Sequence, residues 1–413
     1  MIGSRLLAIE GVAVADVCNG LAQHFTVENE SGKRQLLCMR GMQPNDLRLV
    51  IPHASDESVT YQIETPSGKR TDLKLNTLTT DQFRQWHAAL QPNTKAELPT
   101  DDLAYGFVGK GKNTMYLRLR NIVGRDCFEF MRDNGWDYTN QLQYVYNSWG
   151  KTMPADPNEA IAQMPSFTDE FEKMLQAMKQ HRSKHLIIDL RGNSGGFTPI
   201  TLPTLYQLWG DKYLAEQSKW TNISTKLISP LTLKKYNQSL AQLNADQNTS
   251  YIMGDYFFDD DEQPTSSQIT DEVRKQFIAN SMSSVKDKLT AQHGQPVYTP
   301  ERVYVLTDPG TFSAAFHYAF YLWQMGATVV GVTSRQAPNT YMEQTEFALP
   351  RTGIRGSISN ALQMFLPADH PRAKDFAPDL QPTYNDYRRY NFDDNTIALY
   401  LLDQIEATNS KKK

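Results

Sequence analysis

The chain has 413 residues, of which 40% are hydrophobic and 21% charged, so it is globular in composition and too long for one ordinary hydrophobic core. A net charge of −4 at pH 7 argues against a general nucleic-acid binder, and no stretch approaches the ~18 consecutive apolar residues of a membrane span. Three scattered cysteines form neither a disulfide framework nor a metal motif.

The first eighty residues predict a small α+β unit. Residues 3–11 form a strand that closes at a glycine turn, and a short helix begins near Asp16. Residues 58–64 alternate in polarity, turn at 66–69 and alternate again, which indicates a β-hairpin. Residues 81–104 are expected to be a linker or a short helix.

Residues 105–210 favour alternating strands and helices. Residues 114–119 predict a strand, and 168–181 an amphipathic helix that leads into a buried strand at 185–190. Such a unit is right-handed by default. The aromatic-rich segment 127–157 favours packing under a long loop, with a peptide groove as the alternative.

Residues 211–298 lack this strand rhythm. They contain helical runs at 233–243 and 269–289, and we expect a helical insertion or lid beside the active face. The acidic run 259–262 lacks the ligand spacing and glycine of a calcium loop, so a solvated turn is expected there.

Residues 302–331 predict a strand, a sharp Asp-Pro-Gly turn, a helix and a second strand. Ser313 falls on the first turn of this helix, where unpaired backbone N–H groups would stabilise a developing oxyanion. The alternative is that Ser313 or Thr311 only caps the helix.

A second turn, 191–196, follows the strand at 185–190 and has three glycines, typical of a backbone that must approach something closely. It lacks the spacing and lysine of a P-loop. With the segments 310–315, 327–331 and 377–383, this turn resembles the tail-specific or C-terminal processing serine peptidases.

That resemblance implies an α/β fold with a crotonase-like core, a partial PDZ-like N-terminal module and a helical insertion. The implied boundaries are a PDZ-like module at 1–80, a linker at 81–104, the core at 105–210 and 299–405, the insertion at 211–298, and a basic tail at 406–413. A small independent α+β domain is the alternative for 1–80.

The resemblance places the nucleophile on Ser313 and the oxyanion-binding amides on Ala314 and on Gly195 or Gly196. In the Ser/Lys dyad branch, the lysine would fall at Ala337, so this chain is expected to belong to the tricorn-like and retinoid-binding-protein-like branch. That branch uses a histidine from a segment ahead of the PDZ-like module, which would precede Met1.

Within the chain, His317 is the candidate base because it follows Ser313 by one helical turn, although packing of its ring is the favoured interpretation. The remaining weaker candidates are His185, His293 and His370, with Glu343 and Glu346 as groups that could orient a base. The glutamate that many relatives carry three residues after the serine is Phe316 here.

Two functions from different classes follow. One is a serine endopeptidase that uses Ser313, and the other is an inactive relative that binds a peptide or an apolar ligand. A crotonase-type acyl-CoA enzyme is a weaker third reading. We expect a protein or peptide substrate, no cofactor, no metal and no nucleic acid, and by resemblance an extracytoplasmic location without a signal peptide in this chain; the oligomeric state stays open.

Overall fold

The computed structural model describes residues 2–41, 43–91, 93–94, 96–221, 223–258 and 269–411, with the side chains of 409–411 left aside. The acidic run 259–262 and the end of the basic tail lie outside the described residues.

The centre of the molecule is a five-stranded sheet of order β11-β10-β7-β6-β5. Strands β6, β7, β10 and β11 are parallel, and β5 pairs antiparallel with β6. Parallel strands are covered on both faces, which explains why their sequences are nearly continuous apolar runs. The bounds are β5 (Leu103–Val108), β6 (Thr114–Leu119), β7 (His185–Asp189), β10 (Arg302–Thr307) and β11 (Thr328–Gly331).

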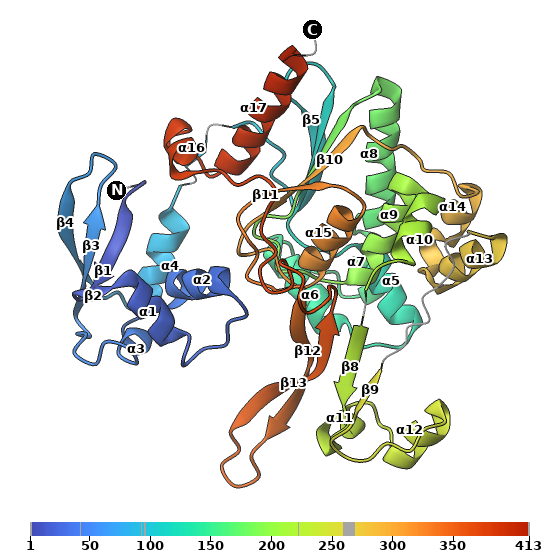
Figure 1. Cartoon of the computed structure of the whole chain (residues 1–413), viewed down its shortest axis with the longest axis horizontal. Helices are drawn as coiled ribbons and strands as arrows, with labels where there is room; N and C mark the ends of the chain where they lie inside the picture. Colours follow the sequence, from blue (N-terminus) through green and yellow to red (C-terminus); the bar gives the residue numbers. More distant parts are fainter. Residues whose placement is uncertain are drawn as a thin grey trace.

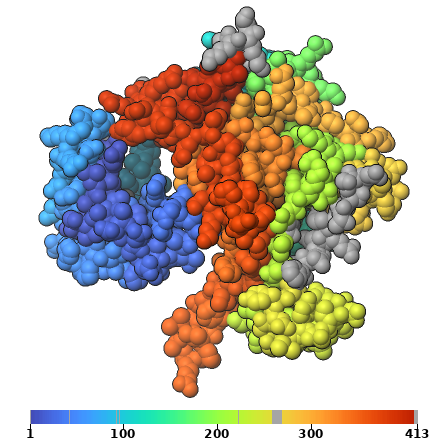
Figure 2. All heavy atoms as spheres, viewed as in Figure 1, coloured from blue at the N-terminus to red at the C-terminus, as the bar shows by residue number. Residues whose placement is uncertain are grey.

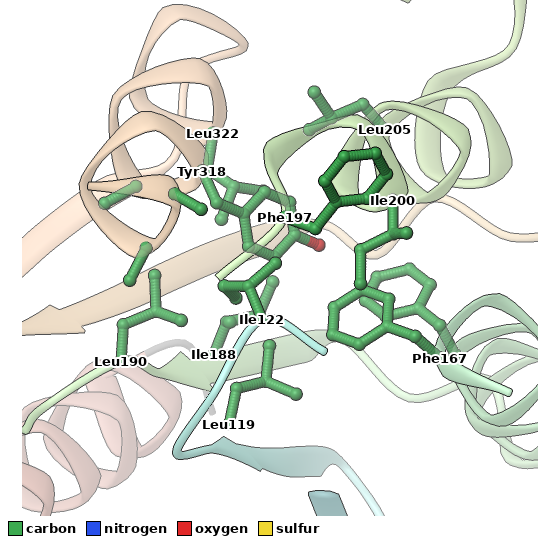
Figure 3. Close-up of a cluster of buried hydrophobic side chains, with 14 of the residues drawn as sticks. Leu119, Ile122, Phe167, Ile188, Leu190, Phe197, Ile200, Leu205, Tyr318 and Leu322 are labelled. Carbon is green, nitrogen blue, oxygen red and sulfur yellow. The ribbon is translucent and has the colours of Figure 1, made fainter. Parts of the chain in front are cut away.

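Alternate side chains of these strands enter two different cores because successive side chains point to opposite faces. Leu186 and Ile188 pack with helices α8 (Phe167–His181), α9 (Thr201–Trp209) and α15 (Ala314–Gln324). Ile187 packs on the other face with α17 (Thr396–Lys411). Figure 3 shows the first core, where Leu119 of β6, Ile188 of β7 and Leu190 just after β7 lie near Tyr318 and Leu322 of α15.

The predicted strands and helices of this core are confirmed. Ser166 caps α8 by accepting from the Asp169 amide, and Arg182 ends it in the left-handed conformation. The aromatic-rich segment forms α5 (Arg125–Asp133), α6 (Thr139–Ser148) and α7 (Pro157–Ala162), which contribute to the same core.

Residues 5–89 form a separate small sheet of order β2-β1-β3-β4 with its own core around Ile9, Val17 and Leu21. The predicted hairpin is confirmed as β3 paired with β4. The segment 81–104 contains the expected short helix. The bounds are β1 (Arg5–Ile9), β2 (Val12–Ala13), α1 (Val14–Leu21), α2 (Glu30–Arg40), α3 (Pro44–Leu47), β3 (Ser58–Glu64), β4 (Arg70–Asn76) and α4 (Thr80–Ala89).

The insertion is not purely helical, which corrects the prediction for 211–298. Strands β8 (Ile223–Leu227) and β9 (Tyr256–Phe258) join β12 (Asn339–Ala348) and β13 (Arg355–Met364) in a third sheet of order β12-β13-β8-β9, at the bottom of Figure 1. Strand β8 is stabilised by pairing with β13, which is distant in sequence, so its local pattern gives little signal.

The helices of the insertion are α10 (Asp211–Gln217), α11 (Pro230–Lys235), α12 (Leu240–Gln247), α13 (Asp271–Asn280) and α14 (Lys286–Ala291), with a short 3-10 turn at Ser283–Val285. Another 3-10 turn, Thr198–Ile200, precedes α9 in the core. Helix α16 (Tyr384–Arg389) precedes α17.

Candidate active site

The loops after β7 and β10 leave the same edge of the sheet and bond to each other. The Thr311 hydroxyl donates to the carbonyl of Leu190 at 2.9 Å, and the Phe312 amide donates to the carbonyl of Asn193 at 3.0 Å. One carboxylate oxygen of Asp308 accepts from the amides of Gly192, Gly310 and Thr311. The two segments singled out by sequence are therefore brought together in space.

Ser313 stands between the second loop and α15 with a backbone of φ 52° and ψ −127°. Residues other than glycine rarely adopt this backbone conformation, which costs on the order of 1–3 kcal/mol. The Ser313 side chain makes no capping hydrogen bond to α15, and the Thr311 hydroxyl is committed to Leu190. The capping interpretation is therefore wrong, and the Ser313 hydroxyl is left available on a strained strand-to-helix turn.

The glycine turn lies directly against this serine. A Cβ placed on Gly195 would lie 2.8 Å from Ser313 Cβ and 3.0 Å from the Ala314 nitrogen. A Cβ on Gly196 would meet the Ile122 carbonyl oxygen at 2.2 Å. Both positions have positive φ, so only glycine fits without strain.

The two glycine amides are not equivalent. The Gly195 amide donates to Oδ1 of the buried Asn193 at 2.9 Å. Among the described residues, neither Gly196 nor Ala314 has an acceptor for its amide hydrogen. Asn193 also donates through Nδ2 to the carbonyl of Leu119 at 2.9 Å, so its side chain fixes the turn from within the core.

The candidate base His317 is buried in α15, and the partners of its two ring nitrogens are residues other than Ser313. Its Nδ1 lies 3.1 Å from the Thr198 hydroxyl and its Nε2 lies 3.5 Å from Nε2 of Gln336. Burial lowers the pKa of His317 to about 4. Gln336 in turn accepts the Ser313 amide hydrogen through Oε1. His317 thus contacts the serine's partner.

Sequence reasoning missed Gln336, Asn193 and Asp308 as residues that shape the site. Gln336 is next to Ala337, where the dyad lysine would fall, and that adjacency was the one available signal. Phe316 is fully buried beside Phe376.

Of the other candidates from sequence, His370 and His185 do not line the Ser313 cavity, whereas Glu343 does. His370 contacts Trp323 through its ring, and His185 lies at the opposite end of β7. Glu343 pairs with Lys235 of the insertion at 2.9 Å.

Residues 333–337, which carry Gln336, are held by the N-terminal unit. Ser31 donates to the carbonyl of Thr333 at 2.5 Å, and Asn29 donates to the carbonyl of Ser334 at 2.9 Å. The Glu28 carboxylate accepts the Ala337 amide hydrogen at 2.8 Å. Figure 2 shows this blue N-terminal unit lying beside the orange and red second half.

Ser313 lines a cavity of about 560 Å³ between α2 and β12. Its other lining residues come from 25–40, 312, 335–344 and 359, and none comes from the described part of 211–298. The insertion contacts this wall through Lys235, which pairs with Glu343 of β12 at 2.9 Å. The predicted lid is therefore not part of the wall of this cavity.

Beneath the turn lies a buried ion pair of Asp189 and Arg191, 2.7 Å apart. Burial alone would raise the pKa of Asp189, but Arg191 and Arg118 outweigh it and hold that pKa below its usual value. Arg191 also donates to the carbonyl of Asp394 at 3.1 Å and to Asn395 at 3.0 Å.

Serine hydrolases place their nucleophile on a strained turn at a helix start, beside backbone amides that can bind an oxyanion, and the surroundings of Ser313 resemble that arrangement. The family model for peptidase family S41 matches residues 159–364, which include β7, the glycine turn, β10 and α15. The chain belongs to peptidase family S41.

Several solved structures are similar to this chain. Mature CPAF is 15% identical with a TM-score of 0.46, and the match covers 98% of this chain and 76% of that one. The photosystem II D1 C-terminal processing protease is 12% identical with a TM-score of 0.32, covering 92% and 64%. A putative S41 protease from Bacteroides fragilis NCTC 9343 is 10% identical with a TM-score of 0.37, covering 98% and 73%.

No curated protein matches the sequence. Within the described residues, no helix combines the length and apolar character needed to cross a membrane. The same residues contain no group of three or more His, Cys, Asp or Glu side chains arranged to hold a metal ion.

Proposed function

We propose that the chain is a serine endopeptidase of the tail-specific type in which the Ser313 hydroxyl attacks the carbonyl carbon of a peptide bond. The observation that carries this proposal is the strained backbone of Ser313, whose side chain is not used as a cap and opens into a cavity. Strain of this kind persists where the surrounding structure enforces it, and it gathers at active sites.

In this proposal the oxyanion is bound by the amides of Ala314 and Gly196. Both have no acceptor among the described residues, and the Ala314 amide is the first of α15, where the helix dipole favours negative charge. The Gly195 amide serves a different purpose, because Asn193 already occupies it. Gly195 lets the turn approach Ser313 closely.

The Ser313 proton must pass to a base when the hydroxyl attacks. His317 is neutral at pH 7, but its ring nitrogens face Thr198 and Gln336, so we assign it to positioning Gln336. A base supplied by a segment beyond the described residues agrees with the expected tricorn-like branch.

The same proposal covers the fold family of the core, the N-terminal unit and the cellular location. The parallel sheet with its crossover helices suits a crotonase-like core, and residues 1–80 suit a partial PDZ-like module. An extracytoplasmic location follows by resemblance to the tail-specific family.

A second candidate function is an inactive relative that binds a peptide in the same cavity. Ala337 in place of a lysine and the bonding of His317 favour it. Peptide binding without hydrolysis would be its signature.

Labelling with a fluorophosphonate separates the two functions, because this reagent reacts only with an activated serine. We expect labelling of the wild type and none of Ser313→Ala. Ser194→Ala is the matched control, since Ser194 is an exposed serine of the neighbouring turn and its loss should leave labelling unchanged. Labelling or hydrolysis that persists in pure Ser313→Ala protein overturns the assignment, and a folded wild type that never reacts favours the inactive relative.

A further inference from the structure

Arg335 lines the Ser313 cavity and also a neighbouring cavity of about 790 Å³. Its guanidinium carbon lies 4.6 Å from the centre of the Phe312 ring, and Phe312 directly precedes Ser313. The next residue after Arg335 is Gln336, which accepts the Ser313 amide hydrogen. Arg335 therefore lies close to Ser313: its guanidinium stacks on Phe312, and the residue that follows it, Gln336, binds the Ser313 amide.

Within the described part of the chain, Arg335 has no ion-pair partner. Its Nε is buried without a hydrogen-bond partner, and Nη1 faces only the Met39 sulfur at 3.9 Å. A thioether is a weak acceptor. A guanidinium donates five N–H groups in a fork that matches a carboxylate, so this side chain has donors left for a ligand.

Nearby charged groups do not satisfy these donors. The Glu28 carboxylate shares the cavity and attracts Arg335 electrostatically, but it accepts from the Ala337 amide and Thr340 and forms no ion pair within 4.0 Å of Arg335. Arg40, the other arginine in the wall, pairs with Asp46 at 3.2 Å and stacks on Phe25. Arg335 is therefore the arginine of this wall whose guanidinium has no hydrogen-bonded or ion-paired carboxylate among the described residues.

We propose that Arg335 binds a carboxylate of the peptide substrate within one or two residues of the bond that Ser313 attacks. The carboxylate can come from an acidic side chain or from a free C-terminus, and both present the same two oxygens to the fork. This inference rests on the proposed peptidase function and adds a substrate class to it.

Binding is measured on Ser313→Ala, which keeps the cavity but cannot turn over, with three fluorescent peptides of otherwise equal sequence. One carries a glutamate and an amidated end, the second a free C-terminus without acidic side chains, and the third neither. We expect the first or the second to bind roughly 10- to 100-fold more tightly than the third, as for a hydrogen bond to a charged group. The peptide with the higher affinity shows whether the bound carboxylate is an acidic side chain or the C-terminus.

Adding Arg335→Gln should abolish that preference while leaving the third peptide's affinity unchanged, and Arg335→Lys should restore only part of it because the fork is lost. Arg34→Gln is the charge-matched control, since Arg34 is exposed in the wall of the neighbouring cavity and should leave the preference intact. Circular dichroism confirms that each variant is folded.

The outcomes separate this inference from the proposed function. Hydrolysis by the wild type without any preference for carboxylate, or with a preference that survives Arg335→Gln, overturns the role of Arg335 alone. An Arg335-dependent preference in a protein that never hydrolyses peptides or reacts with fluorophosphonate supports Arg335 and overturns the peptidase. Failure of all three peptides to bind, together with no hydrolysis, overturns both.

Discussion

The loop after β10 and the loop after β11 both reach Ser313, but they are held by different parts of the molecule. Residues 308–313 are fixed by the core, through Leu190 and Asn193 of the neighbouring loop. Residues 333–337 bond to Glu28, Asn29 and Ser31 of the N-terminal unit as well as to Thr311. The proposed nucleophile and the proposed oxyanion donors thus belong to the core, whereas the position of Gln336 depends on contacts with the N-terminal unit.

The largest effect is expected from Gly195→Ala on the core side. The new Cβ would lie 2.8 Å from Ser313 Cβ at a φ of +115°, so the turn must move away from the serine. Peptidase activity and fluorophosphonate labelling should fall at least ~100-fold, as when an oxyanion site is lost. Gly68→Ala is the control, because Gly68 has a φ of +83° with open space around it and lies in the β3–β4 turn. Equal losses in both variants would contradict this assignment.

Asn193→Ala tests how the core supports the glycine turn. It leaves the Leu119 carbonyl and the Gly195 amide without their partner in a fully buried position. We expect a loss of roughly 2–3 kcal/mol in the free energy of unfolding, together with reduced labelling. Urea unfolding measures it, and Asn147→Ala on the exposed face of α6 should change stability by less than ~0.5 kcal/mol.

His317 makes stability depend on pH. Its folded pKa of about 4 lies below its usual 6.5, so the unfolded state binds more protons between these values. The contribution is complete above pH 6.5 and is lost as pH falls towards 4, by roughly 3 kcal/mol in total. Unfolding curves across this range should lose most of that slope in His317→Gln, and an unchanged slope would show that other groups cause it.

The smallest effect is expected on the docking side, from Ser31→Ala. It removes the bond to the Thr333 carbonyl without weakening α2, since alanine is a good helix former. Hydrogen exchange should become faster in 333–337 and stay unchanged in 308–313, with ~1 kcal/mol lost in stability. Ser67→Ala, which removes a hydroxyl contact inside the exposed β3–β4 turn, should leave both loops as they are.

The same difference explains which parts of the site could be predicted. The strand, turn and helix around Ser313 and the glycine turn after β7 are local patterns, and parallel strands bring their carboxyl ends to one edge. The partners of Gln336 and Asn193 arise from tertiary contacts that no spacing in the sequence encodes. The third sheet escaped prediction for the same reason, because β8 exists through its pairing with β13.

Arg191 needs partners that are synthesised much later than it is. It directly precedes Gly192, and two of its hydrogen bonds go to Asp394 and Asn395, 203 and 204 residues further along the chain. A ribosome adds ~5–20 residues per second, so a nascent chain holds the glycine turn for many seconds before those partners emerge. Until then the Asp189–Arg191 pair lacks part of its bonding, and the turn that faces Ser313 is among the last parts of the protein to be completed.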